Sequence, residues 1–272
     1  MIKDYGRAIK NIRRDLKRYI LKDSIKSLII GESGGIDSAL CSVLAKKICD
    51  SINIPLIGRS YPTEHNKSNE IERARKVGEN FCTEFKEIDI TEDYKALIMS
   101  ISKDDPNILG DGIDAKIRRG NIQARTRMIK LFDLARANRG MVLSTDNYTE
   151  LLCGFWTLKG DEGNFGMIQN IWKTEEYELT DYILMNEELS KEQHEILEEC
   201  RNAICTDGLG VSNSDLEQLE VKSYEEADSL LREYLDGDTS VENHPIIKRY
   251  KATEYKRNDP YNILREVILF GE

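Results

Sequence analysis

Short apolar runs alternate with helically spaced apolar positions through the first half of the chain. Continuous runs at residues 28–30 and 141–143 are typical of buried strands, whereas Ile71, Ala74 and Val77 recur at the spacing of one helix face. The pattern predicts strands over residues 27–31, 54–59, 84–90 and 140–145, and helices over residues 4–22, 36–50, 68–80, 92–103 and about 115–138. Strands that alternate with helices through short connections indicate an α/β fold with a doubly wound parallel sheet flanked by helices.

The last third of the chain has a mostly helical pattern. It predicts helices over residues 175–188, 190–203, 223–235, 240–250 and 259–268. Residues 156–170 show little periodicity and contain three glycines, so we expect them to form a loop that covers an active site. Because no repeat or Pro/Gly-rich linker interrupts the pattern, we expect one domain over residues 1–272.

A glycine-rich turn follows the first predicted strand, with the sequence Gly31-Glu32-Ser33-Gly34-Gly35-Ile36-Asp37-Ser38. A turn of this kind leaves backbone N–H groups at the positive end of a helix dipole, which favours a bound phosphate. Gly34 and Gly35 allow close approach of the phosphate, and Ser33 and Ser38 add hydroxyl donors. The carboxylate of Asp37 fits such a site if Mg²⁺ lies between it and the phosphate oxygens. The alternative interpretation is a serine-capped turn in which Asp37 only stabilises the helix N-terminus.

A second group of polar residues follows the predicted strand at 140–145. In a parallel sheet, ligands bind beyond the carboxyl ends of the strands, and both loops lie at that edge. Thr145, Asp146 and Glu150 are therefore expected on the same side of the sheet as Asp37. Glu150 lies about one helical turn after Asp146, so it can face the glycine loop.

Charge and composition exclude several classes of function. The formal net charge is −10 and the isoelectric point is near 5.1, which disfavours non-specific nucleic-acid binding. No apolar run reaches the length of about 18 residues that a membrane span needs. Six scattered cysteines without a C-x-x-C pair and three scattered histidines predict neither a disulfide framework nor a zinc site. We expect a reduced, cytoplasmic protein.

Two further motifs extend the glycine loop into a family pattern. Residues 120–129 contain Gly-Asn-Ile-Gln-Ala-Arg-Thr-Arg-Met-Ile, and residues 145–150 and 154–161 contain Thr-Asp-Asn-Tyr-Thr-Glu and Gly-Phe-Trp-Thr-Leu-Lys-Gly-Asp. The glycine loop alone resembles the SGGxDS loop of the ATP pyrophosphatases. The three motifs in this order, within a likeness that runs from about residue 25 to residue 256, resemble NAD synthetase. Asparagine synthetases, GMP synthetases and tRNA thiolases share only the first motif.

The resemblance implies an enzyme with a two-step reaction and the adenine-nucleotide alpha hydrolase-like fold of the ATP pyrophosphatases. The nicotinate carboxylate of deamido-NAD attacks the α-phosphate of ATP and releases pyrophosphate. Ammonia then attacks the acyl-adenylate, which gives NAD and AMP. The implied substrates are ATP, deamido-NAD and ammonia, and the implied cofactor is Mg²⁺.

The resemblance also assigns roles to individual residues. The implied metal ligands are Asp37 and Glu150, and the implied catalytic residues are Asp161 and Lys173. The implied ATP-binding residues are Gly31, Ser33, Gly34, Gly35, Ile36, Asp37, Ser38, Thr145, Lys173 and Thr206. The implied deamido-NAD-binding residues are Arg125, Phe155, Lys159, Asp161, Asn164, Tyr255 and Lys256. Alternatives stay open for some of them: Phe155 as a core aromatic, Thr145 as a helix cap and Asp161 as a loop-stabilising residue.

The chain departs from the family pattern at a few positions. Glu32 adds a negative charge beside the phosphate loop, and its side chain is expected to point either into solvent or toward Mg²⁺. Tyr255 replaces the family's histidine, and Lys159 and Asn164 lie in a loop of uncertain register. No glutaminase domain is expected ahead of the loop, so ammonia is the implied nitrogen donor, and the family resemblance implies a homodimer. The competing hypotheses are another adenylating amidotransferase or thiolase, and a catalytically inactive nucleotide-binding homologue.

Overall fold

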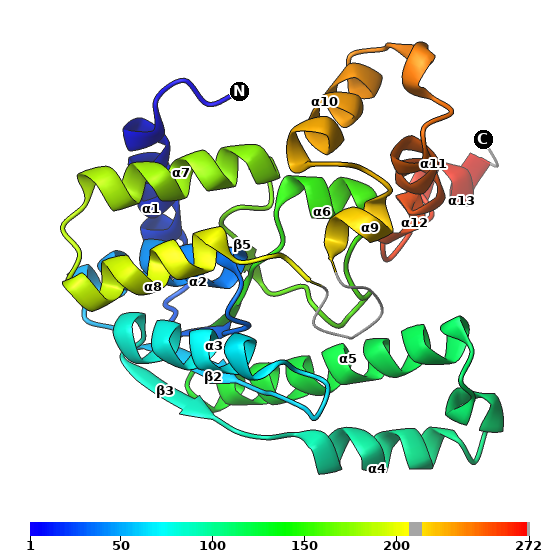
Figure 1. Ribbon diagram of the computed structural model, residues 1–272, viewed down its shortest axis with the longest axis horizontal. Helices are drawn as coiled ribbons and strands as arrows, with labels where there is room; N and C mark the ends of the chain where they lie inside the picture. Colours follow the sequence, from blue (N-terminus) through cyan, green and yellow to red (C-terminus); the bar gives the residue numbers. More distant parts are fainter. Residues whose placement is uncertain (207–213, 271–272) are drawn as a thin grey trace.

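Five parallel strands form the centre of the molecule, in the order β3-β2-β1-β4-β5 (Figure 1). The computed structural model describes residues 1–206 and 214–270. The strands are β1 (Leu28–Gly31), β2 (Leu56–Ser60), β3 (Glu84–Glu87), β4 (Met141–Ser144) and β5 (Phe165–Gly166). This arrangement confirms the predicted α/β fold with a doubly wound parallel sheet.

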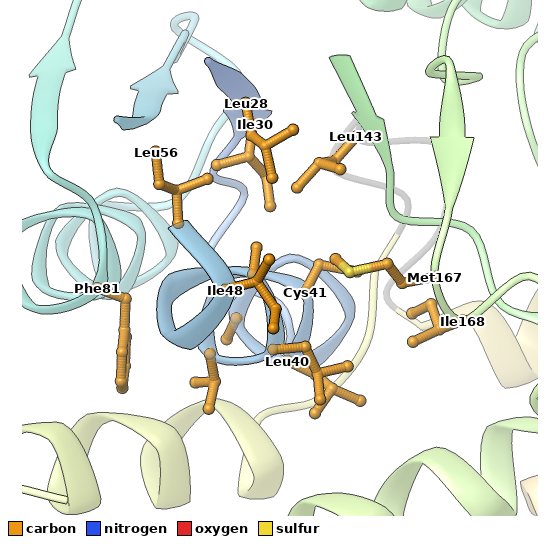
Figure 2. Packing of buried hydrophobic residues seen from close by; sticks show 14 of the residues in the cluster. Leu28, Ile30, Leu40, Cys41, Ile48, Leu56, Phe81, Leu143, Met167 and Ile168 are labelled. Atoms are coloured by element: carbon orange, nitrogen blue, oxygen red, sulfur yellow. The ribbon is translucent and has the colours of Figure 1, made fainter. Parts of the chain in front are cut away.

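Side chains of the central strands alternate between two hydrophobic layers. Leu28 and Ile30 of β1 face a larger layer, and Ile29 faces a smaller layer on the opposite side of the sheet. Figure 2 shows Leu28, Ile30, Leu56 and Leu143 directed toward the helix that carries Leu40, Cys41 and Ile48. Burial on both faces explains why these strands appear in the sequence as continuous apolar runs.

Helices cover both faces of the sheet. The larger layer is packed by α1 (Tyr5–Lys22), α2 (Ile36–Ile52), α3 (Ser68–Phe81), α7 (Lys173–Asn186) and α8 (Lys191–Asn202). The smaller layer is packed by α5 (Ile113–Ala137), against which α4 (Thr91–Ile101) and the 3₁₀ turn η1 (Pro106–Leu109) lie (Figure 1).

A third hydrophobic cluster gathers the C-terminal helices against α6 (Tyr148–Cys153). It contains Leu219 of α9 (Asp215–Leu219), Leu231 of α10 (Tyr224–Leu235) and Ile246 of α11 (Pro245–Ala252). The remaining elements are η2 (Thr239–Val241), α12 (Glu254–Arg257) and α13 (Arg265–Phe270). Because α6 directly follows β4, this cluster attaches the last third of the chain to the carboxyl edge of the sheet.

Three of the predicted segments differ from the structure. Residues 156–170 are not entirely a loop, because β5 lies within them and extends the sheet beside β4. The helix predicted over 240–250 begins only at Pro245, after a 3₁₀ turn, since His244 caps the helix and proline occupies its first turn. The helix predicted over 259–268 is shifted to Arg265–Phe270. Within the described residues, no helix combines the length and apolar character that crossing a membrane requires.

Candidate active site

A cavity of about 470 Å³ opens at the carboxyl edge of the sheet. The register that pairs Leu28 with Met141 and Ile29 with Val142 sets the end of β1 beside the end of β4. Residues after β1, β2 and β4 and parts of α3 and α5 line the cavity, as the topology requires. The predicted site residues in its lining are Gly31, Ser33, Gly35, Asp37, Thr145, Glu150, Phe155, Asp161, Thr206 and Lys256. The predicted site residues outside the described lining are Gly34, Ile36, Ser38, Lys173, Arg125, Lys159, Asn164 and Tyr255.

Hydrogen bonds within the glycine loop hold its turn in place. Ser38 donates its hydroxyl to the carbonyl of Gly35 at 3.3 Å and accepts the N–H of Ser33 at 3.3 Å. Gly34 has φ +80°, and a Cβ there would lie 2.4 Å from the carbonyl oxygen of Glu70, so only glycine fits. Arg73 of α3 donates to the Gly34 carbonyl at 2.9 Å. Ser38 and Gly34 therefore shape the loop from behind, while Ser33 and Gly35 face the cavity.

Asn147, the N-cap of α6, orients the two carboxylates predicted to bind metal. Its side-chain amide donates to Asp37 Oδ1 at 2.8 Å, and its backbone N–H donates to Glu150 Oε2 at 3.1 Å. Burial, and then the negative charge of Asp37, raise the pKa of Glu150 well above its usual range. Two neighbouring carboxylates that repel each other in this way suit a shared cation.

Lys173 is the counter-ion of Asp37 and of a third carboxylate, Glu176. Its side chain is 1% exposed, and its Nζ is 2.7 Å and 2.8 Å from the two oxygens of Asp37 and 3.1 Å from Glu176 Oε2. Burial opposes charge on both groups, but their mutual attraction lowers the pKa of Asp37 and raises the pKa of Lys173. Burial, and then the charge of Asp37, raise the pKa of Glu176 well above its usual range. Glu176 is a fully buried member of this cluster that the sequence motifs did not identify.

A second group of cavity-lining residues comes from residues 154–161 and from α12. Asp161 accepts the N–H of Thr157 at 2.6 Å, and burial raises its pKa. Lys256 donates to the carbonyl oxygens of Gly154, at 2.7 Å, and Trp156. Phe155 lies between Gly154 and Trp156 in the chain, and its ring centroid is 5.2 Å from the guanidinium of Arg249. Together these residues offer an aromatic ring, a carboxyl group and two cationic side chains.

Three of the predicted substrate residues have other partners, and a fourth, Tyr255, is exposed. Arg125 is exposed and donates to the Leu158 carbonyl at 3.1 Å, while the exposed Lys159 pairs with Asp259 at 2.5 Å. Asn164 accepts the N–H of Val142 at 2.9 Å and thereby holds β5 against β4. Tyr255 is 62% exposed.

Two cavity residues lie inside the recognised motifs but were not assigned a role. Arg127 donates to the Tyr61 carbonyl at 3.0 Å and to Asn66 Oδ1 at 3.1 Å, and it lines the cavity from α5. Burial, and then the negative charge of Asp161, raise the pKa of Asp146 to about 7. On a helix, residues two apart point in different directions, so the sequence alone did not show that Arg127 rather than Arg125 faces the cavity.

Glu32 does not point into solvent. The residue is 4% exposed, and its Oε1 accepts hydrogen bonds from Ser42 Oγ and, at 3.7 Å, from Cys82 Sγ. Its Oε2 has no hydrogen-bond partner among the described residues. The expectation that this side chain points into solvent is therefore wrong. Glu32 packs between α2 and α3, and it is also one of the residues that line the cavity.

Sequence and structure comparisons place the molecule among enzymes of NAD metabolism. The NAD synthase family model matches residues 8–260. The NH₃-dependent NAD⁺ synthetase of Thermoplasma acidophilum is 27% identical over 265 residues, which cover 96% of this chain and 98% of that protein. The NH₃-dependent NAD⁺ synthetase of Methanococcoides burtonii is 31% identical over 251 residues, which cover 87% of this chain and 86% of that protein. The NMN synthetase structure from Francisella tularensis matches with a TM-score of 0.77 and 23% identity, covering 94% of this chain and 97% of that one.

Proposed function

Because the chain belongs to the NAD synthase family, we propose that it is a ligase that converts deamido-NAD to NAD with ATP and ammonia. The carboxylate of the substrate displaces pyrophosphate from ATP, and ammonia then displaces AMP. The observation that carries this proposal is the convergence of the glycine loop, Asp37 and Glu150 on one cavity at the carboxyl edge of the sheet.

The loop, Thr145, Thr206 and Lys173 form the ATP end of the site in this proposal. A helix dipole contributes only about 0.3–1 kcal/mol to a nearby anion. Binding ATP with a dissociation constant near 100 μM requires about 5.5 kcal/mol. The loop alone is therefore too weak, and positive charge from a metal must supply much of the remainder, because Lys173 is already paired with Asp37 and Glu176.

Asp37 and Glu150 would hold the Mg²⁺ that arrives with ATP. Their oxygens are hard ligands, and Asn147 orients both. Burial and the negative charge of Asp37 raise the pKa of Glu150 despite the nearby charge of Lys173, so an added cation would stabilise its ionised form. The described residues contain no cluster of three or more metal-ligating side chains. A Mg²⁺ ion here would accordingly complete its coordination with phosphate oxygens and water, and would neutralise charge on the departing pyrophosphate.

The nicotinate end of deamido-NAD would lie near Phe155, Asp161 and Lys256. Asp161 would orient ammonia or accept its proton, and Lys256 would face the carboxylate. The exposed positions Arg125, Lys159, Asn164 and Tyr255 would contact the rest of the dinucleotide beyond the cavity. Arg125 lies on α5, the helix that we also propose to contact a second subunit.

A homodimer is part of the proposal. Ile113 and Ile129 of α5 are 61% and 63% exposed, and Met99 of the neighbouring α4 is 57% exposed. A surface with several large exposed apolar side chains is favourable for subunit contact. A cytoplasmic location agrees with six cysteines that are all free thiols.

The test is an assay with purified protein, ATP, Mg²⁺, ammonium and deamido-NAD. We expect NAD and AMP in equal amounts, and almost no product when glutamine replaces ammonium. A parallel reaction contains nicotinic acid mononucleotide, because one structural relative is an NMN synthetase. Release of ADP, full turnover with glutamine alone, or a preference for the mononucleotide would contradict the proposal.

A further inference from the structure

A fully buried carboxylate joins the two helices that carry the proposed ATP and metal ligands. Asp228 of α10 is 0% exposed. Its Oδ1 accepts the hydroxyl of Thr149 at 2.5 Å, and its Oδ2 accepts the N–H and the hydroxyl of Thr174 at 3.0 Å and 2.7 Å. A buried carboxylate without hydrogen-bond partners is strongly destabilising. The three hydrogen bonds to Asp228 therefore fix α10 to both α6 and α7.

The partners of Asp228 are the immediate neighbours of functional residues. Thr149 precedes Glu150 on α6, and Thr174 follows Lys173 at the start of α7. The Lys173 N–H also donates to Thr149 Oγ1 at 3.0 Å, so a continuous chain runs from Lys173 through Thr149 to Asp228. These N–H groups belong to the first turn of α7, where a helix has no internal acceptors. Asp228 thus caps α7 from a distant part of the chain.

A second contact from α10 strengthens the same connection. Arg232, one turn after Asp228, donates to Thr174 Oγ1 at 3.4 Å, and its guanidinium lies 4.6 Å from the centroid of the Trp172 ring. The start of α7 is therefore held by α10 at two points. The C-terminal helices consequently do more than complete a hydrophobic core.

We infer that Asp228 is a positioning residue that fixes Lys173 and Glu150 against Asp37 for the binding of Mg²⁺ and ATP. The inference rests on the proposed function for the roles of those three residues. Lys173 Nζ is within 2.8 Å of both Asp37 oxygens, and a displacement of about 1 Å at a catalytic group can lower turnover by 10²-fold. Residues that orient metal ligands typically change metal affinity or activity by about 10–100-fold when they are removed.

The test compares Asp228→Asn with Leu231→Ala. Leu231 lies on the same helix, is also 0% exposed, and packs only in the hydrophobic cluster. We measure kcat for NAD formation, the Mg²⁺ concentration at half-maximal rate, and unfolding by urea. We expect Asp228→Asn to lower kcat by about 10–100-fold and to raise the Mg²⁺ requirement. Leu231→Ala should lose stability through its cavity but keep both kinetic values within about twofold.

The Thr149 hydroxyl provides an independent pair of variants in case Asp228→Asn does not fold. Thr149→Val removes the hydroxyl between Lys173 and Asp228 and should reproduce the kinetic loss. Thr149→Ser retains this hydroxyl and should keep the activity of the wild type. The loss from Thr149→Val should not add to that from Asp228→Asn, because both break one chain of hydrogen bonds.

The possible failures are distinguishable. Unchanged kcat and Mg²⁺ dependence in a folded Asp228→Asn variant would overturn the inference while leaving the proposed function intact. An equal kinetic loss in Leu231→Ala would overturn it as well, because the effect would then follow stability alone. If the wild type makes no NAD, the proposed function fails, and calorimetric titration of both proteins with Mg²⁺ and ATP decides the inference: equal affinities refute it.

Discussion

Replacing Glu32 with glutamine should stabilise the protein at alkaline pH and have much less effect at acidic pH. Glu32 is buried at the end of β1 without a cationic partner, and one of its oxygens has no hydrogen-bond partner among the described residues. Burial is the main cause that raises the pKa of Glu32 from 4.5 to about 7, against the opposing hydrogen bond from Ser42. The folded protein therefore favours the neutral acid, whereas the unfolded chain ionises at its ordinary pKa.

The sign and size of the effect follow from proton linkage. A carboxyl group with a raised pKa in the folded state contributes stability that is present below pH 4.5 and is lost as the pH rises through about 7. The rise from 4.5 to about 7 corresponds to about 3.4 kcal/mol over the whole titration, of which about 2.5 kcal/mol falls between pH 5 and pH 8. The glutamine variant does not titrate, so it avoids this loss.

Urea unfolding of the wild type and Glu32→Gln between pH 5 and pH 8 measures the difference directly. Other groups titrate in both proteins and cancel in the comparison. We expect the free energy of unfolding of the variant, relative to wild type, to increase by about 2.5 kcal/mol across this range. The exposed Glu79→Gln on α3 is the matched control, since its side chain is solvated in both states. A difference between Glu32→Gln and wild type that stays flat with pH would refute the argument, because Glu32 would then have to be solvated or paired.

Four further substitutions test the site assignments. Asp37→Ala and Glu150→Ala should each lower Mg²⁺-dependent turnover by about 10²-fold or more while circular dichroism shows a folded protein; near-normal turnover in either would remove that residue from the metal site. Arg125→Ala should raise the KM for deamido-NAD more than the KM for ATP, and equal changes would point to a structural role. Asp161→Asn keeps an acceptor for the Thr157 N–H but removes the charge, so it should change the ammonium KM or kcat. If the ammonium KM and kcat of this variant both match those of the wild type, Asp161 is excluded from the amidation step.

Much of the fold was predictable because its local signals agree with its tertiary environment. The central strands are buried on both faces, and this leaves the continuous apolar runs by which β1 and β4 are recognised. The two residues of β5 carry no periodicity, and their place in the sheet depends on Asn164, which pairs with Val142 far along the chain. Because β5 forms through its pairing with β4, the hydrophobic pattern of its own two residues does not predict it.

The motifs contain many of the residues that line the cavity, but they do not show how each side chain is oriented. Arg125 and Arg127 have the same charge and belong to one motif, yet only Arg127 lines the cavity, because the rotation of α5 is set by its packing on Ile29 and Val142. The same limit applies to Glu32, whose burial depends on Ser42 and Cys82. A residue type indicates which chemistry is possible, whereas the neighbours that packing brings to it determine its ionisation.

The surroundings of Lys173 show why charge balance has to be taken from the structure. In the sequence this lysine appears as a cation available to phosphate. In the folded chain it is the counter-ion of Asp37 and Glu176, and breaking a buried pair of this kind typically costs about 3–5 kcal/mol. Its ammonium group is therefore not free positive charge, and the surplus of carboxyl groups around it is met by raised pKa values at Glu150 and Glu176. In the proposed function, an anion as highly charged as ATP would be favoured at such an edge only together with an additional cation. The protein's own charges therefore support the proposed divalent metal, as does the chemistry of pyrophosphate release.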